Sequence, residues 1–176
     1  MTDAAARARA TVLREFRWIE GHSDVWRLAE DPLVFADVVG GLAFLARQLG
    51  ADAVAGIETR GVLFGAPVAR ELGVGFHAIR KTDGLFAGSA HSATSDADYR
   101  GRSHTLRSRG RFGRGARVVL VDDWIERGSQ AAAARELIED AGATFAGVVA
   151  IVDQSDGALI VRSLVAAAEL PPDRED

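Results

Sequence analysis

The most informative stretch of this sequence is Arg117-Val-Val-Leu-Val-Asp-Asp-Trp-Ile-Glu-Arg-Gly-Ser-Gln130. Its apolar run, 118–121, predicts a buried strand, and a polar turn then leads into a helix over 131–139. Ligands of open α/β sheets bind beyond the carboxyl ends of strands, where a helix N-terminus can hold a phosphate. Asp122 and Asp123 at this point can accept hydrogen bonds from sugar hydroxyls. The stretch therefore suits a sugar phosphate, although an ordinary strand–helix corner with acidic residues near a helix N-terminus is the alternative.

Apolar strands and helices alternate outward from this stretch. The spacing predicts helices over 31–50 and 62–72, and buried strands over 53–57, 74–79 and 145–152. This alternation indicates an α/β fold with a mostly parallel central sheet flanked by helices on both faces. At 176 residues, the chain fits one domain spanning 1–176.

Three segments lie outside this alternation. Residues 1–16 are rich in Ala and Arg and predict a short surface helix, and 171–176 predict a frayed tail. Residues 82–116 are rich in Gly, Ser, Asp and Arg with few apolar anchors, which is typical of a flexible lid. This segment is interpreted as a solvated surface loop, a flap that closes over an anionic substrate, or an RNA contact. The absence of interleaved aromatic residues disfavours RNA.

Composition excludes several classes of protein. The net charge of −4 argues against non-specific nucleic-acid binding, and no apolar run is long enough to span a membrane. The absence of Cys excludes disulfides and cysteine-ligated metals, and it fits a cytoplasmic protein. The four His residues show no metal-ligand spacing. Lys81 is the sole lysine among 21 basic residues, which draws attention to its position at the end of a predicted strand.

Two stretches together resemble a known family. The strand followed by Asp122-Asp123 resembles the motif by which type I phosphoribosyltransferases bind phosphoribosyl pyrophosphate (PRPP). Residues 55–73 resemble the signature of the adenine phosphoribosyltransferases, and the following strand ends in Arg80-Lys81, as in that family. Residues 25–32 are similar to the family block that covers the base, which implies a small N-terminal hood over 1–32. The signature positions that match are Gly56, Ile57, Glu58, Arg60, Gly61, Phe64 and Gly65.

The resemblance implies a magnesium-dependent enzyme that transfers the phosphoribosyl group of PRPP to a nitrogen of a purine-like base and releases pyrophosphate. It also implies a homodimer and a magnesium ion held mainly by PRPP, with no direct protein ligand. The pyrophosphate loop would be Glu58, Thr59, Arg60 and Gly61, with a cis peptide between its first two residues. The residues implied in PRPP binding are Arg60, Lys81, Asp122, Asp123, Glu126, Arg127, Gly128, Ser129 and Gln130. Those implied in catalysis are Asp98, Asp122 and Asp123, and those implied in base binding are Val25, Arg27 and Trp124.

Several of these positions have plainer interpretations. Arg60 is also interpreted as a helix-surface charge, Lys81 as a solvated strand end and Asp98 as a loop carboxylate without a catalytic part. Trp124 stands where the family commonly has Leu against the base, and it is interpreted as a core residue or as an aromatic plate for an acceptor other than adenine. The phosphate loop departs from the family Thr-Gly-Gly-Thr at Arg127, Ser129 and Gln130.

Arg127 decides between two functions. It can bind phosphate through two N–H groups, or point outward and leave the backbone to bind the 5′-phosphate. If it blocked that phosphate, the protein would be a PRPP- or nucleotide-sensing regulator on the same fold. An oxidoreductase of the dinucleotide-binding class is disfavoured, because no G-x-G-x-x-G follows a strand.

Overall fold

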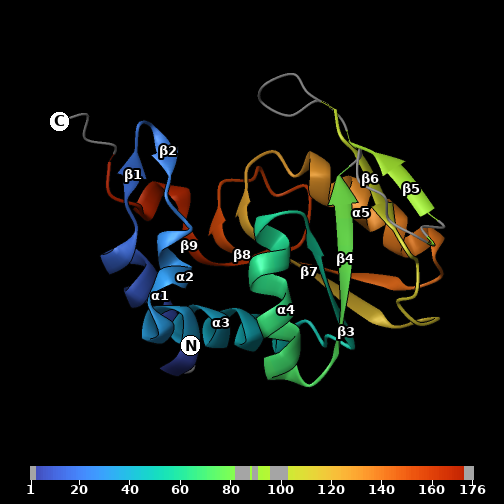
Figure 1. Cartoon of the computed structure of the whole chain (residues 1–176), viewed down its shortest axis with the longest axis horizontal. Coiled ribbons are helices and arrows are strands. Elements are labelled where there is room, and N and C mark those ends of the chain that lie inside the picture. Colours follow the sequence, from blue (N-terminus) through green and yellow to red (C-terminus); the bar gives the residue numbers. More distant parts are fainter. Residues whose placement is uncertain (1–2, 82–87, 89–90, 96–102, 173–176) are drawn as a thin grey trace.

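A computed structural model describes residues 3–81, 88, 91–95 and 103–172. Its helices are α1 (Asp3–Glu15), α2 (Arg27–Glu30), α3 (Pro32–Gln48), α4 (Arg60–Leu72), α5 (Ser129–Asp140) and the short 3₁₀ helix η1 (Ala167–Glu169). Its strands are β1 (Trp18–Ile19), β2 (His22–Ser23), β3 (Ala53–Ile57), β4 (Gly75–Lys81), β5 (His91–Thr94), β6 (Thr105–Ser108), β7 (Arg117–Ile125), β8 (Thr144–Asp153) and β9 (Val161–Ala166). Figure 1 shows their arrangement.

The main sheet has the order β5-β6-β4-β3-β7-β8-β9. Strands β4, β3, β7, β8 and β9 run parallel, whereas β6 and β5 are antiparallel and extend the edge beside β4. The predicted α/β class with a mostly parallel sheet is confirmed. Because β3, β4 and β7 are adjacent and parallel, their carboxyl ends meet at one edge, where the predicted site residues follow.

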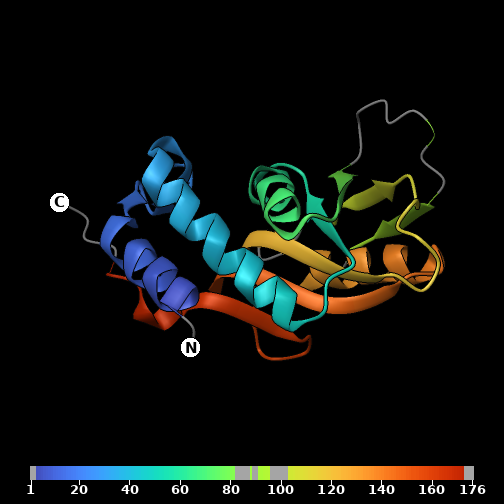
Figure 2. The ribbon, with the colours of Figure 1, turned by 90° about the horizontal axis from the view of Figure 1, so that it is seen from below.

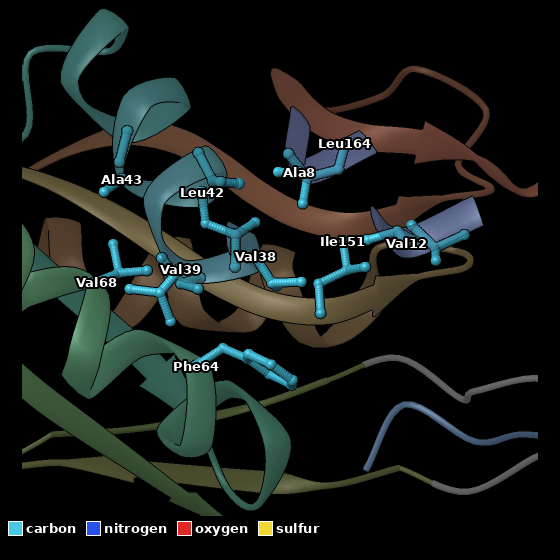
Figure 3. Packing of buried hydrophobic residues seen from close by; sticks show 14 of the residues in the cluster. Ala8, Val12, Val38, Val39, Leu42, Ala43, Phe64, Val68, Ile151 and Leu164 are labelled. Carbon is cyan, nitrogen blue, oxygen red and sulfur yellow. The ribbon is translucent and has the colours of Figure 1, made fainter. Parts of the chain in front are cut away.

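Helices cover both faces of the sheet, as the alternating pattern predicts. One apolar cluster joins α1, α3 and α4 to the sheet, and a second joins α5 to the opposite face. Figure 2 shows α3 and α4 along the same side of the strands, and Figure 3 shows Val38 and Val39 of α3 beside Phe64 and Val68 of α4. The central strand β3 is buried along its whole length, which explains its continuous apolar run.

Helix α3 forms where the sequence predicts it. The carboxylate of Asp31 accepts hydrogen bonds from the backbone N–H groups of Leu33 and Val34, at 2.8 and 3.0 Å, and Pro32 occupies the first turn. An acidic N-cap followed by Pro stabilises a helix start, because Pro lacks the N–H that would otherwise be unpaired. Gly50, with a φ of 67°, follows the helix end.

Strand β7 is longer than predicted. It extends to Ile125, so Asp122 and Asp123 lie within the strand and not after it. Backbone pairing with β8 continues through Asp122 opposite Ala150 and Trp124 opposite Val152. Both residues are therefore carried by a rigid, hydrogen-bonded strand.

The segment 82–116, predicted as a flexible lid, contains strands that sequence reasoning did not identify. Its described part contains β5 and β6, which pair antiparallel, and β6 also pairs with the end of β4 through Lys81 opposite Leu106. Leu106 and Phe112 are buried and anchor this hairpin to the second apolar cluster. The predicted catalytic residue Asp98 lies outside the described residues, and so does the end of the predicted tail.

Both ends of the described chain pack closely together. Helix α1, predicted as a surface helix, buries Ala8 and Val12 against α3 and β9, so that prediction holds only for its outer face. Strand β9, which sequence reasoning did not identify, forms the sheet edge beside β8. Within the described residues, no helix is long and apolar enough to cross a membrane.

Candidate active site

A cleft of about 410 Å³ opens at the carboxyl ends of β3, β4 and β7. The N-termini of α4 and α5 border it, and the β1–β2 hairpin contributes its far side. Most of the predicted site residues come together here although they are distant in sequence. Those that line the cleft are Glu58, Thr59, Arg60, Lys81, Asp122, Asp123, Trp124, Glu126, Arg127, Gly128, Ser129 and Gln130.

Asp123 is the most deeply placed acid of the cleft. It is 4% exposed, and Nε of Arg60 lies 3.1 Å from its Oδ2. This contact is an ion pair without hydrogen-bond alignment, because Oδ2 has no hydrogen-bond partner among the described residues. Arg60, which is 38% exposed, therefore neutralises the buried carboxylate and still presents part of its guanidinium to the cleft. A buried carboxylate with an unused acceptor atom is suited to a ligand that donates hydrogen bonds.

Asp122 has a raised pKa. Burial of its carboxyl, together with the nearby charge of Asp123, raises its pKa well above the ordinary value, and Lys81 acts in the opposite direction. Its Oδ1 accepts a hydrogen bond of 2.9 Å from the backbone N–H of Asp123. The carboxyl also lies against Gly61, where an added Cβ would be 3.3 Å from Oδ1. A carboxyl with raised proton affinity thus lies next to the buried Asp123 on the same strand.

We expect the replacement Asp122→Asn to change how stability depends on pH. The raised pKa means that the folded protein retains a proton that the unfolded chain releases above about pH 3.8, so folding weakens as the pH rises through this window. Asn cannot titrate, so the free energy of unfolding of the variant relative to the wild type should increase with pH there. Urea unfolding at several pH values measures this difference. For the exposed control Asp140→Asn, the difference in unfolding free energy from the wild type should not change with pH. A difference that does not change with pH for Asp122→Asn would contradict the prediction.

The predicted pyrophosphate loop is held to the end of β4. The peptide between Glu58 and Thr59 is cis, as the resemblance implies. The Glu58 carboxylate accepts hydrogen bonds from Nε and Nη2 of Arg80 at 3.2 and 3.3 Å, and from the backbone N–H of Lys81 at 3.2 Å. The bonds from Arg80 are the main reason why the pKa of Glu58 is lowered. Glu58 therefore orients the loop, and Arg60 and Lys81 are the cations that line this end of the cleft.

The other end of the cleft is the N-terminus of α5. Gly128 precedes the helix with a φ of 71°, and no side chain caps the helix there. The first intrahelical bond runs from Ala132 N–H to the Gly128 carbonyl, so the N–H groups of 129–131 have no intrahelical acceptors. These residues line the cleft, and the helix dipole favours an anion at this point. The exposed side chain of Arg127 lies beside the same position.

The third side of the cleft is aromatic. Trp124 lies with its ring centroid 6.0 Å from that of Trp18 and 6.3 Å from that of Phe16. Trp18, Gly21, His22, Ser23 and Gln154 also line the cleft, and sequence reasoning missed all of them. The hairpin of β1 and β2 is too short to produce a periodic pattern, so no sequence signal separated its residues from the surrounding loop.

Two predicted base-binding residues do not line this cleft. Val25 is fully buried in the apolar core. Arg27 is exposed and places Nη2 3.9 Å from the Glu15 carboxylate. The side chain of Val25 cannot reach a ligand in this cleft, because it packs among other apolar side chains. Of the three predicted base-binding residues, only Trp124 lines the cleft.

The acidic residues of the cleft are hard oxygen donors, which Mg²⁺ prefers. The described residues contain no group of three or more His, Asp or Glu side chains that could hold a metal ion by themselves. Asp123 nevertheless retains a buried Oδ2 without a hydrogen bond, and Asp122 lies beside it. The donor set thus fits an ion that a bound phosphate ligand brings and shares, not an ion held by a protein cage.

Comparisons with known proteins agree with this geometry. Residues 27–166 match the family described as phosphoribosyl transferase domain. The adenine phosphoribosyltransferase of Kineococcus radiotolerans is 38% identical over 85% of this chain and 83% of its own length. That of Frankia casuarinae is 39% identical over 75% of this chain and 69% of its own length.

Solved structures give the same result. The adenine phosphoribosyltransferase of Thermoanaerobacter pseudethanolicus superposes with a TM-score of 0.79 at 28% identity, covering 90% of this chain and 99% of its own. The Saccharomyces cerevisiae enzyme, in complex with an imino-altritol bisphosphate and adenine, superposes with a TM-score of 0.78 at 28% identity. It covers 90% of this chain and 99% of its own. The chain therefore belongs to the phosphoribosyl transferase domain family, and it is a pentosyl-transferring enzyme similar to the adenine phosphoribosyltransferases.

Proposed function

We propose that this enzyme transfers the 5-phosphoribosyl group of PRPP to a ring nitrogen of a purine-like base and releases pyrophosphate. The observation that supports this most is the meeting, in one cleft, of an uncapped helix N-terminus, an acidic pair and two cations. A 5′-phosphate, ribose hydroxyls and a pyrophosphate require these three kinds of group. Adenine is the first acceptor to test, because the relatives reported above are named for it.

Each part of PRPP is assigned to residues of matching chemistry. The backbone N–H groups of 129–131 bind the 5′-phosphate, as helix N-termini bind anions in general. Asp122 and Asp123 accept hydrogen bonds from the ribose hydroxyls. Arg60 and Lys81 bind the pyrophosphate and stabilise the negative charge that grows on it as the C1–O bond breaks.

The acidic pair has a second part in the reaction. Positive charge develops on the ribose ring as pyrophosphate departs, and the carboxylate of Asp123 lowers the energy of that state. Mg²⁺, when bound with PRPP, would supply a hard Lewis acid that offsets the pyrophosphate charge. The base approaches C1 from the aromatic side of the cleft, beside Trp124. Its nitrogen forms a bond to C1 as the electron pair of the broken C1–O bond leaves with pyrophosphate, and the proton of the ring N–H is released to pyrophosphate or water.

The decisive experiment measures pyrophosphate release from PRPP in the presence of Mg²⁺ and a panel of bases. We expect release only when a purine-like base is present, with formation of the corresponding nucleoside 5′-monophosphate. Calorimetry with PRPP and Mg²⁺ separates the alternative function. Binding without pyrophosphate release for any base would indicate a PRPP-sensing regulator, and absence of a binding signal would show that Arg127 blocks the phosphate end. The resemblance further implies a homodimer, which sedimentation equilibrium can test.

A further inference from the structure

The two indoles of the cleft have no hydrogen-bond donors left for a ligand. Nε1 of Trp124 donates to Oε1 of Gln154 at 3.0 Å. Nε1 of Trp18 donates to the carbonyl of Pro171 at 2.7 Å. An indole has a single N–H, so both rings can offer only their faces and edges to a bound base. Any polar recognition on this side of the cleft must come from another residue.

Gln154 lies beside Trp124 and can supply such recognition, as can His22 and Ser23, and the orientation of its amide is determined by Trp124. An indole N–H can only donate, so the atom of the Gln154 amide that faces it must be the oxygen. The opposite orientation of the amide would place two donors against each other. The amide nitrogen, with two N–H groups, therefore lies at the end that faces away from the indole. Gln154 lines the cleft, so the two donors of its amide nitrogen remain for a ligand, beside the second lone pair of its oxygen.

The backbone holds Gln154 at a fixed place relative to Trp124. Trp124 pairs with Val152 across β7 and β8, and the backbone N–H of Gln154 donates to the carbonyl of Ile125 at 2.8 Å. The turn after Gln154 is closed by Asp153, whose Oδ1 accepts from the backbone N–H of Ser155 at 2.8 Å. The indole and the amide are thus carried by adjacent strand ends, not by independent loops.

We propose that Gln154 determines acceptor specificity by donating a hydrogen bond to an accepting atom on the edge of the base that lies against Trp124. The accepting atom is a carbonyl oxygen or an unprotonated ring nitrogen. This inference rests on the proposed function, because it assigns the aromatic side of the cleft to the base. Trp124 then has two roles. It packs against the base, and it fixes the direction of the Gln154 amide.

The test measures binding of AMP, IMP and ribose 5-phosphate by calorimetry, so that its result does not depend on turnover. AMP and IMP differ at position 6 of the base, which carries an amino group in one and an oxo group in the other, and ribose 5-phosphate has no base. We expect Gln154→Glu, which keeps the acceptor for Trp124 but removes the donors, to weaken binding of at least one nucleotide by about tenfold or more. Gln154→Met should do the same without adding charge. Ribose 5-phosphate should bind these variants as it binds the wild type.

A further variant tests the role of Trp124. Trp124→Phe keeps an aromatic ring but removes the N–H, so the amide of Gln154 can take either orientation. The ratio of the AMP and IMP dissociation constants should therefore move toward one. The exposed residue Gln48, at the end of α3, provides the matched control Gln48→Glu, for which all three dissociation constants should stay unchanged.

The outcomes separate the possible roles. A loss confined to IMP identifies a carbonyl oxygen as the accepting atom. A loss confined to AMP identifies N1, which carries a proton in IMP, and a loss with both nucleotides identifies a ring nitrogen that accepts in both bases. Unchanged binding of both nucleotides by Gln154→Glu and Gln154→Met would overturn the proposal, as would an equal loss with ribose 5-phosphate or a wild-type protein that binds no nucleotide. Absence of pyrophosphate release, with nucleotide binding sensitive to Gln154, would instead overturn the proposed reaction alone.

Discussion

Replacement of Asp123 by Asn is expected to lower kcat/KM for PRPP by about 100-fold or more, a size typical for the loss of one group that stabilises transition-state charge. Asp123 is almost fully buried, and its Oδ2 has no hydrogen bond among the described residues, so its charge is available to the ribose. Asn has the same shape but no charge to stabilise the oxocarbenium-like state. Steady-state pyrophosphate release measures the effect, and most of the loss should appear in kcat.

The same variant should fold normally. Removal of the carboxylate leaves Arg60 without its ion pair, but Arg60 is 38% exposed and can be hydrated. The urea midpoint should therefore change little, which separates a catalytic loss from a folding defect. Asp140→Asn, at the exposed end of α5, is the matched control and should retain wild-type activity. Activity of Asp123→Asn within about threefold of the wild type would contradict the assigned role, because such a small change corresponds to less than 1 kcal/mol.

The largest stability effect is expected from Gly56→Ala. A Cβ at Gly56 would lie 2.1 Å from the carbonyl oxygen of Gly61 and 3.1 Å from the backbone nitrogen of Val62. These are backbone atoms at the start of α4, so they cannot move aside as a flexible side chain could. We expect the free energy of unfolding to fall by about 3 kcal/mol or more, at the upper end of the cost of overpacking. Equilibrium urea unfolding measures this loss.

Gly40→Ala is the matched control for this substitution. It lies within α3, where an added Cβ meets no atom within 4 Å. Because Ala has a higher helix propensity than Gly, this variant should be more stable by up to about 1 kcal/mol. Equal effects of the two substitutions would show that general Gly-to-Ala changes, not the close approach of β3 to α4, govern stability. Any destabilised Gly56→Ala protein that folds should also bind PRPP poorly, because Gly61 lies behind the carboxyl of Asp122.

Much of the fold follows from local patterns. The acidic cap at Asp31 and helical spacing predict α3, and continuous apolar runs predict β3, β7 and β8. These signals are readable because burial on one face or both faces imposes a periodicity on the residues of the element itself. The hairpin of β5 and β6 and the edge strand β9 escape such reasoning. Their strands are short or mixed in polarity, and neighbouring strands stabilise them.

The residues of the site likewise fall into those that the sequence identifies and those that it does not. Asp122 and Asp123 are identifiable from sequence because a sugar phosphate suits acids at a strand end, and the Arg60 segment is identifiable from its resemblance to the family signature. The aromatic side of the cleft is not identifiable. Trp18 and Gln154 are more than 130 residues apart, and they meet only because the N-terminal hairpin packs at the end of β7 and β8.

The sequence by itself thus determined the α/β class and the residues proposed to bind PRPP, since each depends on residues close together in the chain. Only the tertiary structure decided that Val25 is in the core, that Asp122 and Asp123 lie within a strand, and that the N–H of Trp124 orients the amide of Gln154. These positions and contacts depend on strand register and on packing between distant segments. Register and packing in turn depend on interactions across the whole sheet, which no local sequence pattern records.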